Sequence, residues 1–542
     1  MRVVTSREMR DLDALATTKH KIPAIVLMEN AGLRAAEIIA ARHLELGFRT
    51  EILVFAGKGK NGGDALVVAR QLLAMGKKVR VFLTNGFEDY KDEAKQNLDI
   101  LLQQKIRPIV LDQVGPLEEF FNSAAGPFLC VDGLVGIGFR SPLAGLFADI
   151  VDILNAKTDY VVALDIASGV DATTGQVVGQ AIYANLTISF GWFGASRIID
   201  IDIGVSILWA SRPTLSTSPP KPGAIHRGEL KVIDISLPPA FHREGSIHAL
   251  AKNNVAPLLK RRDRYGHKNS FGHTLLLGGS KGKLGAIAMA GRACLRVGTG
   301  LVTVVTWEDA YEQLLARVED ELMCLPLDFE EKRYTENRDA LFHYSSVVVG
   351  PGMGKGERSE KVISDFIDYF HGPLVIDADG ITILAKDSIR QKLHGRKSPT
   401  ILTPHPGELS RLLGVSKKEV VENPKEMVER AAEETNAIVL LKGATTFICA
   451  GDGHVYLNHY PNDGMATAGS GDVLAGIIGG IVGQQRMDPL DAVCLGVYLH
   501  SLAGDFAAQR LGHRSMTASD IISHLGDSFL DLRKQRELLD PA

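Results

Sequence analysis

The chain has 542 residues, of which 45% are hydrophobic and 23% charged, and this composition excludes a disordered, collagen-like or coiled-coil protein. Its formal net charge is −4, with 60 basic and 64 acidic side chains, so the charge does not favour a nucleic-acid partner. Five widely spaced cysteines do not suit a disulfide framework. The N-terminus lacks the apolar stretch of a signal peptide, and the apolar run at 473–483 is too short to cross a membrane. We therefore expect a cytoplasmic protein with no nucleic-acid or membrane partner.

The first half alternates short apolar runs with amphipathic segments, which is the pattern of a parallel sheet covered by helices on both faces. Thr5 and Glu8 form a capping-box pattern that predicts an early helix start. Strands are then predicted, in chain order, at 51–56, 79–83, 108–111, 128–132, 160–165, 181–190 and 229–235. Helices are predicted between them, at 62–75, 90–104 and after 142. The Pro- and Ser-rich segment 212–223 predicts an irregular loop before the domain boundary at about 240–247.

The second half repeats the alternation. Its strands are predicted at 273–277, 301–306, 346–350, 373–377, 400–403 and 437–442. Each half is therefore expected to be an α/β domain of three layers, one over residues 1–240 and one over 246–535.

A glycine-rich loop follows the first strand and reads Gly57-Lys58-Gly59-Lys60-Asn61-Gly62-Gly63-Asp64. Such a loop can bring backbone N–H groups close to a phosphate at a helix N-terminus. The acidic residue of a dinucleotide fingerprint is missing from the next strand end, so a plain glycine turn is the alternative. The oxygen-bearing side chains of Asn61 and Asp64 favour a ligand-binding loop.

Two more polar loops, 132–140 and 165–171, also follow predicted strands. Ligands of open α/β sheets bind outside the carboxyl ends of the strands, so the three loops predict one site. Asn, Asp and Ser oxygens with backbone carbonyls suit a hard cation. Each aspartate taken alone could instead be only a helix N-cap.

The motifs KNGGDA, DGLVGIGF and DIASGVDATTG resemble the signature loops of NAD(P)H-hydrate epimerases, and the similarity covers most of residues 1–240. The resemblance implies a potassium site at Asn61, Asp132 and Ser168. It implies that the hydrated dinucleotide is bound by Lys60, Asn61, Gly62, Gly63, Asp64, Gly136, Ile137, Gly138, Phe139, Arg140, Ser141, Pro142 and Asp165. The implied reaction interconverts the R and S hydrates at C6, and Asp165 is the candidate for moving a proton. Departures from the family are Lys60 for the usual Asn, Ala167 for the usual Pro, and an altered stretch at 190–228.

In the second half, the segment 462–472 (NDGMATAGSGD) precedes a small-residue helix. Small residues at 469–471 let the first N–H groups of that helix hold a phosphoryl group, helped by the helix dipole. Asp472 could then accept a hydroxyl proton, or it could merely complement the dipole.

Other loops of the second half also follow predicted strands. Lys442-Gly443-Ala444-Thr445-Thr446 suits nucleotide phosphates, and 403–408 places His405 between two prolines. Segments 350–354 and 377–380 end two further strands, and 267–272 and 278–280 bracket the first one. We expect all of these loops at one edge of the sheet.

Six ordered motifs, HKNSFGHTLLLGGS, GPGMG, DADGI, TPHPGE, KGATT and NDGMATAGSGD, resemble ADP/ATP-dependent NAD(P)H-hydrate dehydratases, a branch of the ribokinase-like fold, over about residues 246–525. The resemblance implies that the hydrate is bound by Ala286, Gly352, His405 and Asp472. It implies that the nucleotide is bound by Lys442, Gly443, Ala444, Thr445, Thr446, Asn462, Gly469, Ser470 and Gly471. Ser470 stands where Thr is usual.

Together the two halves resemble bifunctional NAD(P)H-hydrate repair enzymes, which implies an isomerase and a lyase in one chain. The implied substrates are NADHX and NADPHX, with ADP as phosphoryl donor, Mg²⁺ in the second half and K⁺ in the first. Phosphorylation would turn the C6 hydroxyl into a good leaving group, with Asp472 as the base. We expect a homo-oligomer. The alternative is a hydroxymethylpyrimidine-type vitamin-precursor kinase fused to a non-catalytic ligand-binding domain.

Overall fold

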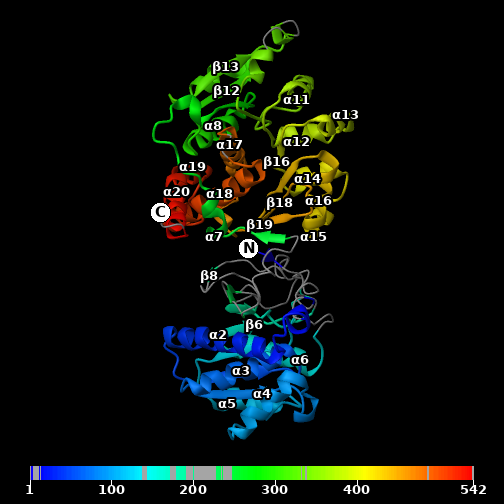
Figure 1. Ribbon diagram of the computed structural model, residues 1–542, viewed down its shortest axis with the longest axis vertical. Coiled ribbons are helices and arrows are strands. Elements are labelled where there is room, and N and C mark those ends of the chain that lie inside the picture. The colour runs from blue at the N-terminus through cyan, green and yellow to red at the C-terminus, as the bar shows by residue number, and fades with distance from the viewer. Residues whose placement is uncertain are drawn as a thin grey trace. The chain divides into compact units, whose positions relative to one another are not determined.

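The computed structural model divides into two compact units, 1–245 and 246–542, and each is an α/β structure with helices against its own sheet (Figure 1). The structure describes residues 2–3, 11, 14–136, 143–170, 177, 179–190, 199–200, 228–233, 235, 247–330, 333–335, 338–484 and 487–539. None of the helices in these ranges is both long and apolar enough to cross a bilayer.

The sheet of the first unit has the strand order β4-β3-β2-β5-β6-β7-β9-β8. Its strands are parallel except for β8, which runs antiparallel to β9. The strands of this part of the chain are β1 (Arg2–Val3), β2 (Ile52–Ala56), β3 (Val79–Leu83), β4 (Ile109–Val110), β5 (Leu129–Gly133), β6 (Tyr160–Leu164), β7 (Leu186–Phe190), β8 (Ile199–Asp200) and β9 (Glu229–Ile233). The described helices are α2 (Ala24–Glu45), α3 (Lys60–Ala74), α4 (Asp92–Gln103), α5 (Gly115–Ser123) and α6 (Leu146–Lys157).

Strand β2 shows why both faces of this sheet are covered. Its side chains alternate: Ile52 and Val54 join the core under α2, α3 and α4, whereas Leu53 and Phe55 join the core under α5 and α6. A strand with apolar residues on both faces must lie between two helical layers. The predicted three-layer α/β fold is therefore confirmed. The Thr5–Glu8 helix start and the 212–223 loop lie outside the described residues.

The second unit contains a larger sheet with the order β10-β19-β18-β17-β16-β15-β14-β11-β12-β13. These strands are β10 (Ile247–Ala249), β11 (His273–Leu277), β12 (Leu301–Trp307), β13 (Met323–Leu327), β14 (Ser346–Val349), β15 (Leu374–Ile376), β16 (Thr400–Leu402), β17 (Ile438–Leu441), β18 (Thr445–Cys449) and β19 (Val455–His459). The α-helices are α7 (Lys252–Val255), α8 (Leu284–Arg296), α9 (Tyr311–Leu315), α11 (Glu357–Tyr369), α12 (Asp379–Leu384), α13 (Asp387–Arg390), α14 (Pro406–Leu413), α15 (Lys417–Glu422), α16 (Pro424–Thr435), α17 (Ser470–Gly483), α18 (Pro489–Leu511), α19 (Ala518–Ser523) and α20 (Leu525–Leu539).

Strands β18 and β19 form an antiparallel hairpin that was not among the predicted strands. As a result, Thr445 and Thr446 lie within a strand and not in an open loop after β17. The alternation of apolar residues on both sides of Gly451-Asp452-Gly453 is a hairpin signal and could have revealed it.

Helix α17 is buried along almost its whole length, and its glycines explain how it fits there. A side chain at Gly476 would place its Cβ 2.1 Å from the Ala290 carbonyl oxygen of α8, and one at Gly479 would meet Val348 of β14 at 2.2 Å. Only glycine allows such close backbone approach. The packing fixes α17 against the sheet, with its N-terminus at residues 469–472.

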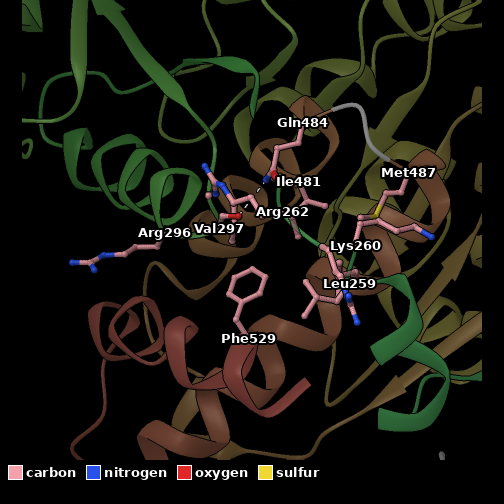
Figure 2. A pocket seen from close by; sticks show the side chains of 12 residues that line it. Leu259, Lys260, Arg262, Arg296, Val297, Ile481, Gln484, Met487 and Phe529 are labelled. Atoms are coloured by element: carbon pink, nitrogen blue, oxygen red, sulfur yellow. Dashed lines mark hydrogen bonds between the residues drawn. The ribbon is translucent and has the colours of Figure 1, made fainter. Parts of the chain in front are cut away.

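The prediction that all motif loops share one sheet edge is wrong for residues 267–272. These residues precede β11, so they lie at the amino edge, whereas α17 begins at the opposite one. A Cβ on Gly272 would lie 2.2 Å from the carbonyl oxygen of Gly483, at the far end of α17. Nearby, the Arg262 guanidinium lies 3.7 Å over the Phe271 ring. Arg262 also lines a cavity of about 230 Å³ at this end of α17, together with Ile481 and Phe529 (Figure 2).

Candidate active sites

The first unit brings together Asp132 and Ser168, which follow or end neighbouring strands. The Ser168 hydroxyl donates to Oδ1 of Asp132 at 2.6 Å, and the Ser168 backbone N–H donates to Oδ2 at 2.8 Å. The Leu134 N–H also donates to Oδ1, at 3.1 Å. Both side chains are fully buried. Burial raises the pKa of Asp132 to about 6, and these hydrogen bonds oppose that shift.

Asn61 completes this group through the backbone of Val135. Its Nδ2 donates to the Val135 carbonyl at 2.9 Å, while the Val135 N–H donates to the Ser168 hydroxyl at 3.0 Å. Asn61 Oδ1 is buried and has no hydrogen-bond partner among the described residues. A buried, unpartnered amide oxygen needs a partner. With a carboxylate and a hydroxyl beside it, the donor set consists of oxygen atoms and fits a hard cation such as K⁺.

Close backbone packing, more than ligand access, explains two glycines of the 57–64 loop. A Cβ on Gly57 would lie 1.9 Å from the Leu134 carbonyl oxygen, and one on Gly62 would lie 1.6 Å from the Gly57 carbonyl oxygen. The neighbouring Gly63 faces Met28 of α2. The loop is thereby pressed against the residues that follow β5, which brings Asn61 to Val135.

The other predicted epimerase residues that the structure describes lie on α3 or after β5 and β6. Lys60 is exposed at the first position of α3, and Asp64 is buried one turn later. Gly136 lies next to Asn61. Asp165 follows β6 in the left-handed region with φ 62°, and its N–H donates to Ile188 at 2.7 Å. Residues Ile137–Pro142 lie outside the described part of the chain.

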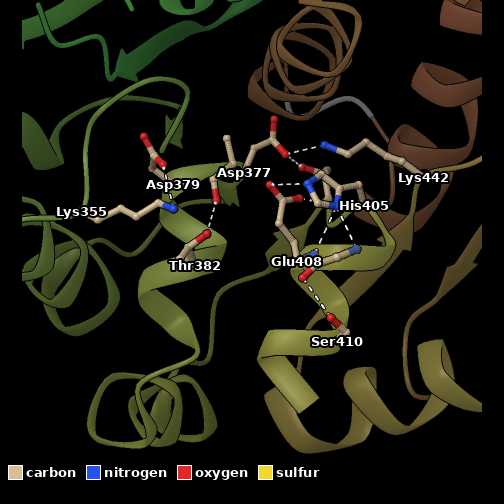
Figure 3. Close-up of polar contacts among 11 residues, drawn as sticks. Lys355, Asp377, Asp379, Thr382, His405, Glu408, Ser410 and Lys442 are labelled. Carbon is tan, nitrogen blue, oxygen red and sulfur yellow. Dashed lines mark hydrogen bonds and ion pairs between the residues drawn. The ribbon is translucent and has the colours of Figure 1, made fainter. Parts of the chain in front are cut away.

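The second unit centres on a buried ion pair. Lys442 Nζ donates to Asp377 Oδ1 at 2.7 Å, and the Thr403 hydroxyl donates to the same oxygen at 2.7 Å. Figure 3 shows Lys442 and Asp377 pointing toward one another from different strand ends. The three residues directly follow β17, β15 and β16, which are adjacent in the sheet. Asp377 is only 1% exposed.

Helix α17 begins beside this ion pair. A Cβ on Gly471 would lie 3.2 Å from Lys442 Nζ, so the ammonium group sits at the first turn of the helix. Gly469 caps the helix with φ 93°, a conformation that favours glycine. The Ser470 carbonyl lies 3.0 Å from His500 Nε2, which anchors the turn to α18. A helix N-terminus with a lysine beside it is suited to hold a phosphoryl group.

Asp472 lies in the first turn of α17 among several charged groups. Burial raises its pKa to about 7, and the negative charges of Asp377, Glu408 and Asp379 add to the shift. Lys442 opposes it. A carboxylate with a pKa near neutrality can take a proton from an acceptor hydroxyl and later release it.

His405 caps helix α14 and faces the same cluster. Its Nδ1 accepts the backbone N–H groups of Gly407 at 2.9 Å and Glu408 at 3.2 Å, and the Glu408 carboxylate accepts the His405 N–H at 2.9 Å (Figure 3). Burial and the charges of Lys442 and Arg411 lower the pKa of His405. Because Nδ1 accepts two N–H groups, a neutral ring carries its proton on Nε2.

Asp379 connects the remaining predicted hydrate-binding residues to this cluster. Gly352 and Ala286 are neighbours, since a Cβ on Gly352 would lie 3.4 Å from that of Ala286. Beside them, Asp379 accepts the Gly354 N–H at 3.0 Å and the Lys283 ammonium at 3.3 Å. Its charge in turn acts on Asp472.

Several predicted nucleotide-binding residues lie in or next to the β18–β19 hairpin. Thr445 Oγ1 lies 2.6 Å from His459 Nδ1, Thr446 Oγ1 donates to Gly443, and Ala444 accepts the Tyr460 N–H. Asn462 accepts the Gly464 N–H and donates to Asp505 of α18 at 3.1 Å.

The predicted set omitted Asp377, Thr403, Asp379 and Glu408, although all four take part in this cluster. Each belongs to one of two quoted motifs, DADGI and TPHPGE, and directly follows or lies near a strand end. The signal was therefore present, but the pairing of Asp377 with a lysine 65 positions away depends on the tertiary fold.

Comparison with known proteins agrees with two enzyme units. Residues 274–526 match a family described as NAD(P)H-hydrate dehydratase, and residues 24–194 match the YjeF-related protein N-terminus family. The bifunctional NAD(P)H-hydrate repair enzyme Nnr of Moorella thermoacetica is 36% identical over 99% of this chain and 98% of its own. That of Coxiella burnetii is 34% identical over 96% of this chain and 98% of its own.

Among solved structures, the ADP/ATP-dependent NAD(P)H-hydrate dehydratase from Bacillus subtilis, co-crystallised with ATP and Mg²⁺, is 26% identical. It covers 53% of this chain and 98% of its own, with a TM-score of 0.47. The two α/β units and the relatives that align over both of them define a tandem α/β enzyme. The chain belongs to the family of bifunctional NAD(P)H-hydrate repair enzymes.

Proposed function

We propose that this chain repairs hydrated nicotinamide nucleotides in two steps. The first unit equilibrates the R and S hydrates of NADH and NADPH, and the second dehydrates the S form at the expense of ADP. The observation that carries the proposal is the placement of Lys442 and Asp472 at the N-terminus of α17, where a phosphoryl group can be held and a hydroxyl proton accepted. The full-length similarity to bifunctional repair enzymes supports both steps.

The second unit converts the C6 hydroxyl of the hydrate into a better leaving group. Hydroxide leaves C6 of the hydrate with difficulty, whereas phosphate leaves readily, pushed by the ring nitrogen. Asp472 accepts the C6 hydroxyl proton while the hydroxyl oxygen attacks the terminal phosphorus of ADP, whose bond to the bridging oxygen breaks and releases AMP. Loss of phosphate from C6 and of a proton from C5 then restores the C5–C6 double bond of the reduced nicotinamide. The N–H groups of the first turn of α17 and the Lys442 ammonium stabilise the transferring phosphoryl. Mg²⁺ would supply positive charge to the transferring phosphoryl. The carboxylates of Asp379 and Glu408 are oxygen ligands at this sheet edge that could hold it.

In the first unit, Asn61, Asp132 and Ser168 would hold K⁺, and the unpartnered Asn61 Oδ1 supports that assignment. The ion would supply positive charge at this edge of the sheet. Lys60–Asp64, Gly136–Pro142 and Asp165 would bind the hydrate. Asp165 is the proposed proton carrier, and its backbone is fixed by the hydrogen bond to Ile188.

A vitamin-precursor kinase joined to a non-catalytic domain is disfavoured, because relatives that align over both units are repair enzymes. We also propose that the chain acts in the cytoplasm as a homo-oligomer. Light scattering of the purified protein tests the oligomeric state.

Incubating the purified chain with S-hydrate of NADH and ADP, ATP or no nucleotide tests the second step through the absorbance of the reduced nicotinamide. We expect recovery with ADP and none without nucleotide. The first step is tested with R-hydrate, ADP and either K⁺ or a large organic cation. Recovery should be faster with K⁺. Phosphorylation of a hydroxymethylpyrimidine without any repair of hydrate would contradict the proposal.

A further inference from the structure

The Asp377 carboxylate lies between two other groups of the second site. Its Oδ1 accepts Lys442 Nζ and the Thr403 hydroxyl, each at 2.7 Å. Its backbone is fixed as well, because the Asp377 N–H donates to Val349 of β14 at 3.1 Å. Asp377 is therefore a rigid, almost fully buried acceptor at the end of its strand.

Lysine needs such an acceptor to be held in one place. Its ammonium sits on a flexible four-carbon stem with three rotatable donors. The hydrogen bond to Asp377 uses one donor and leaves two that can contact a phosphate. The bonded ammonium already lies beside Gly471, at the first turn of α17. In a single side-chain conformation, Lys442 thus bonds to Asp377 and lies beside Gly471.

The carboxylates of the site also maintain the charge of this lysine. Burial alone lowers the pKa of Lys442, but the charges of Asp377 and Glu408 outweigh it, and the pKa is raised above its ordinary value. Lys442 is therefore a partly buried cation beside the first turn of α17, where a phosphate would bind.

We propose that Asp377 is a positioning residue of the dehydratase step: it fixes Lys442 Nζ at the N-terminus of α17 in the position that receives the nucleotide phosphates, and Thr403 fixes Asp377 in turn. The proposal rests on the function proposed above. Asp377 acts through Lys442 and need not touch the substrate.

An ion pair such as Asp377–Lys442 can instead serve stability alone. The pKa of Asp472 distinguishes a structural role from a positioning role, because it depends on the charges of this pair. The negative charges of Asp377, Glu408 and Asp379 raise the pKa of Asp472, and Lys442 lowers it. Lys283 and Lys355 pair with Asp379, and His405 faces the same cluster. Removing one negative neighbour lowers the pKa of Asp472, so the base stays ionised to lower pH.

The test is Asp377→Asn, which keeps the shape and removes the charge. We expect ADP affinity, measured by calorimetry, to fall roughly tenfold or more, as for loss of a hydrogen bond between charged groups. The acidic limb of the kcat profile should move to lower pH. In a Lys442→Met background, Asp377→Asn should change ADP affinity little further. The control is Asp365→Asn, another buried aspartate that pairs with a lysine, Lys361 at 2.8 Å, but lies outside this site.

Unchanged ADP affinity and pH profile in folded Asp377→Asn, or equal effects of Asp365→Asn, would overturn the proposal. If Asp377→Asn does not fold, Thr403→Val takes its place: it should weaken ADP binding by a smaller factor, and unchanged affinity would count against the proposal. The calorimetric readout needs no hydrate. A wild-type enzyme that binds ADP but recovers no reduced nicotinamide would therefore refute the proposed reaction. The role of Asp377 in ADP binding would still be decided by the calorimetry.

Discussion

The two candidate sites both lie at the carboxyl edge of parallel strands, but their side chains differ in charge. The first joins one buried carboxylate with neutral oxygens, oriented by backbone groups of Leu134, Val135 and Ser168. The second gathers several carboxylates around Lys442 at a helix N-terminus. The first is suited to hold a cation and the second to receive an anion. The sheet edge therefore supplies only the location of a site, and the side chains at the strand ends decide its chemistry.

The largest effect is expected from Asp472→Asn, which removes the proposed base of the second site but not its shape. We expect kcat for nucleotide-dependent dehydration to fall by roughly 10²–10⁴, the usual contribution of general base catalysis. Epimerisation of the R and S hydrates, followed by chromatography, should stay at the wild-type rate. A loss of both activities would show that the two sites are not independent.

The next largest effect is on the potassium dependence of the first site. Asn61→Leu removes the buried, unpartnered amide oxygen and should abolish stimulation of epimerisation by K⁺, while ADP-dependent dehydration of S-hydrate is unchanged. Asn97→Leu is the matched control, since Asn97 is a buried asparagine of α4 whose Oδ1 is also without a hydrogen-bond partner among the described residues. Equal potassium stimulation in Asn61→Leu and the wild type would remove the cation assignment.

Dehydration by the wild-type enzyme should show a pH dependence that is set by Asp472 of the second site. Because the pKa of Asp472 is raised to about 7, the base is protonated below that pH, and dehydration should slow as the pH falls through about 7. The slope should be absent from the residual rate of Asp472→Asn. A dehydration rate that stays constant within about one pH unit on either side of this pKa would contradict the role given to Asp472.

The smallest effect concerns His405, whose ring caps α14. His405→Ala should lower the free energy of unfolding by about 1 kcal/mol, the usual cost of losing an N-cap. Asn is itself a good N-cap, so His405→Asn should restore most of the stability. If the ring also binds the hydrate, the KM for hydrate should rise in both variants. Wild-type KM in His405→Asn would leave capping as its role.

Many of the strands and the grouping of several site residues could be predicted from the sequence. Buried strands such as β2 and β11 show continuous apolar runs, and loops at their carboxyl ends must share an edge, so Asp132 with Ser168 and Lys442 with Asp472 could be grouped. The β18–β19 hairpin was missed because Thr445 and Thr446, the first residues of β18, were interpreted as part of a nucleotide-binding loop, and β19 was not predicted. Residues 267–272 were placed at the wrong edge because a motif before a strand lies at its amino end.

The partners of individual side chains could not be predicted. Thr403 and Asp377 are 26 positions apart, and only the order of β15, β16 and β17 brings them together. The cap formed by His405 likewise depends on the ring orientation and not on the motif.

The most direct test of two cooperating sites is to give Asp472→Ala pure R-hydrate of NADH with ADP and K⁺, and to follow both epimers and the reduced nicotinamide over time. We expect S-hydrate to appear and to reach a constant ratio with R-hydrate while no reduced nicotinamide forms. Formation of reduced nicotinamide, or R-hydrate that stays unchanged while wild-type enzyme consumes it, would contradict the account.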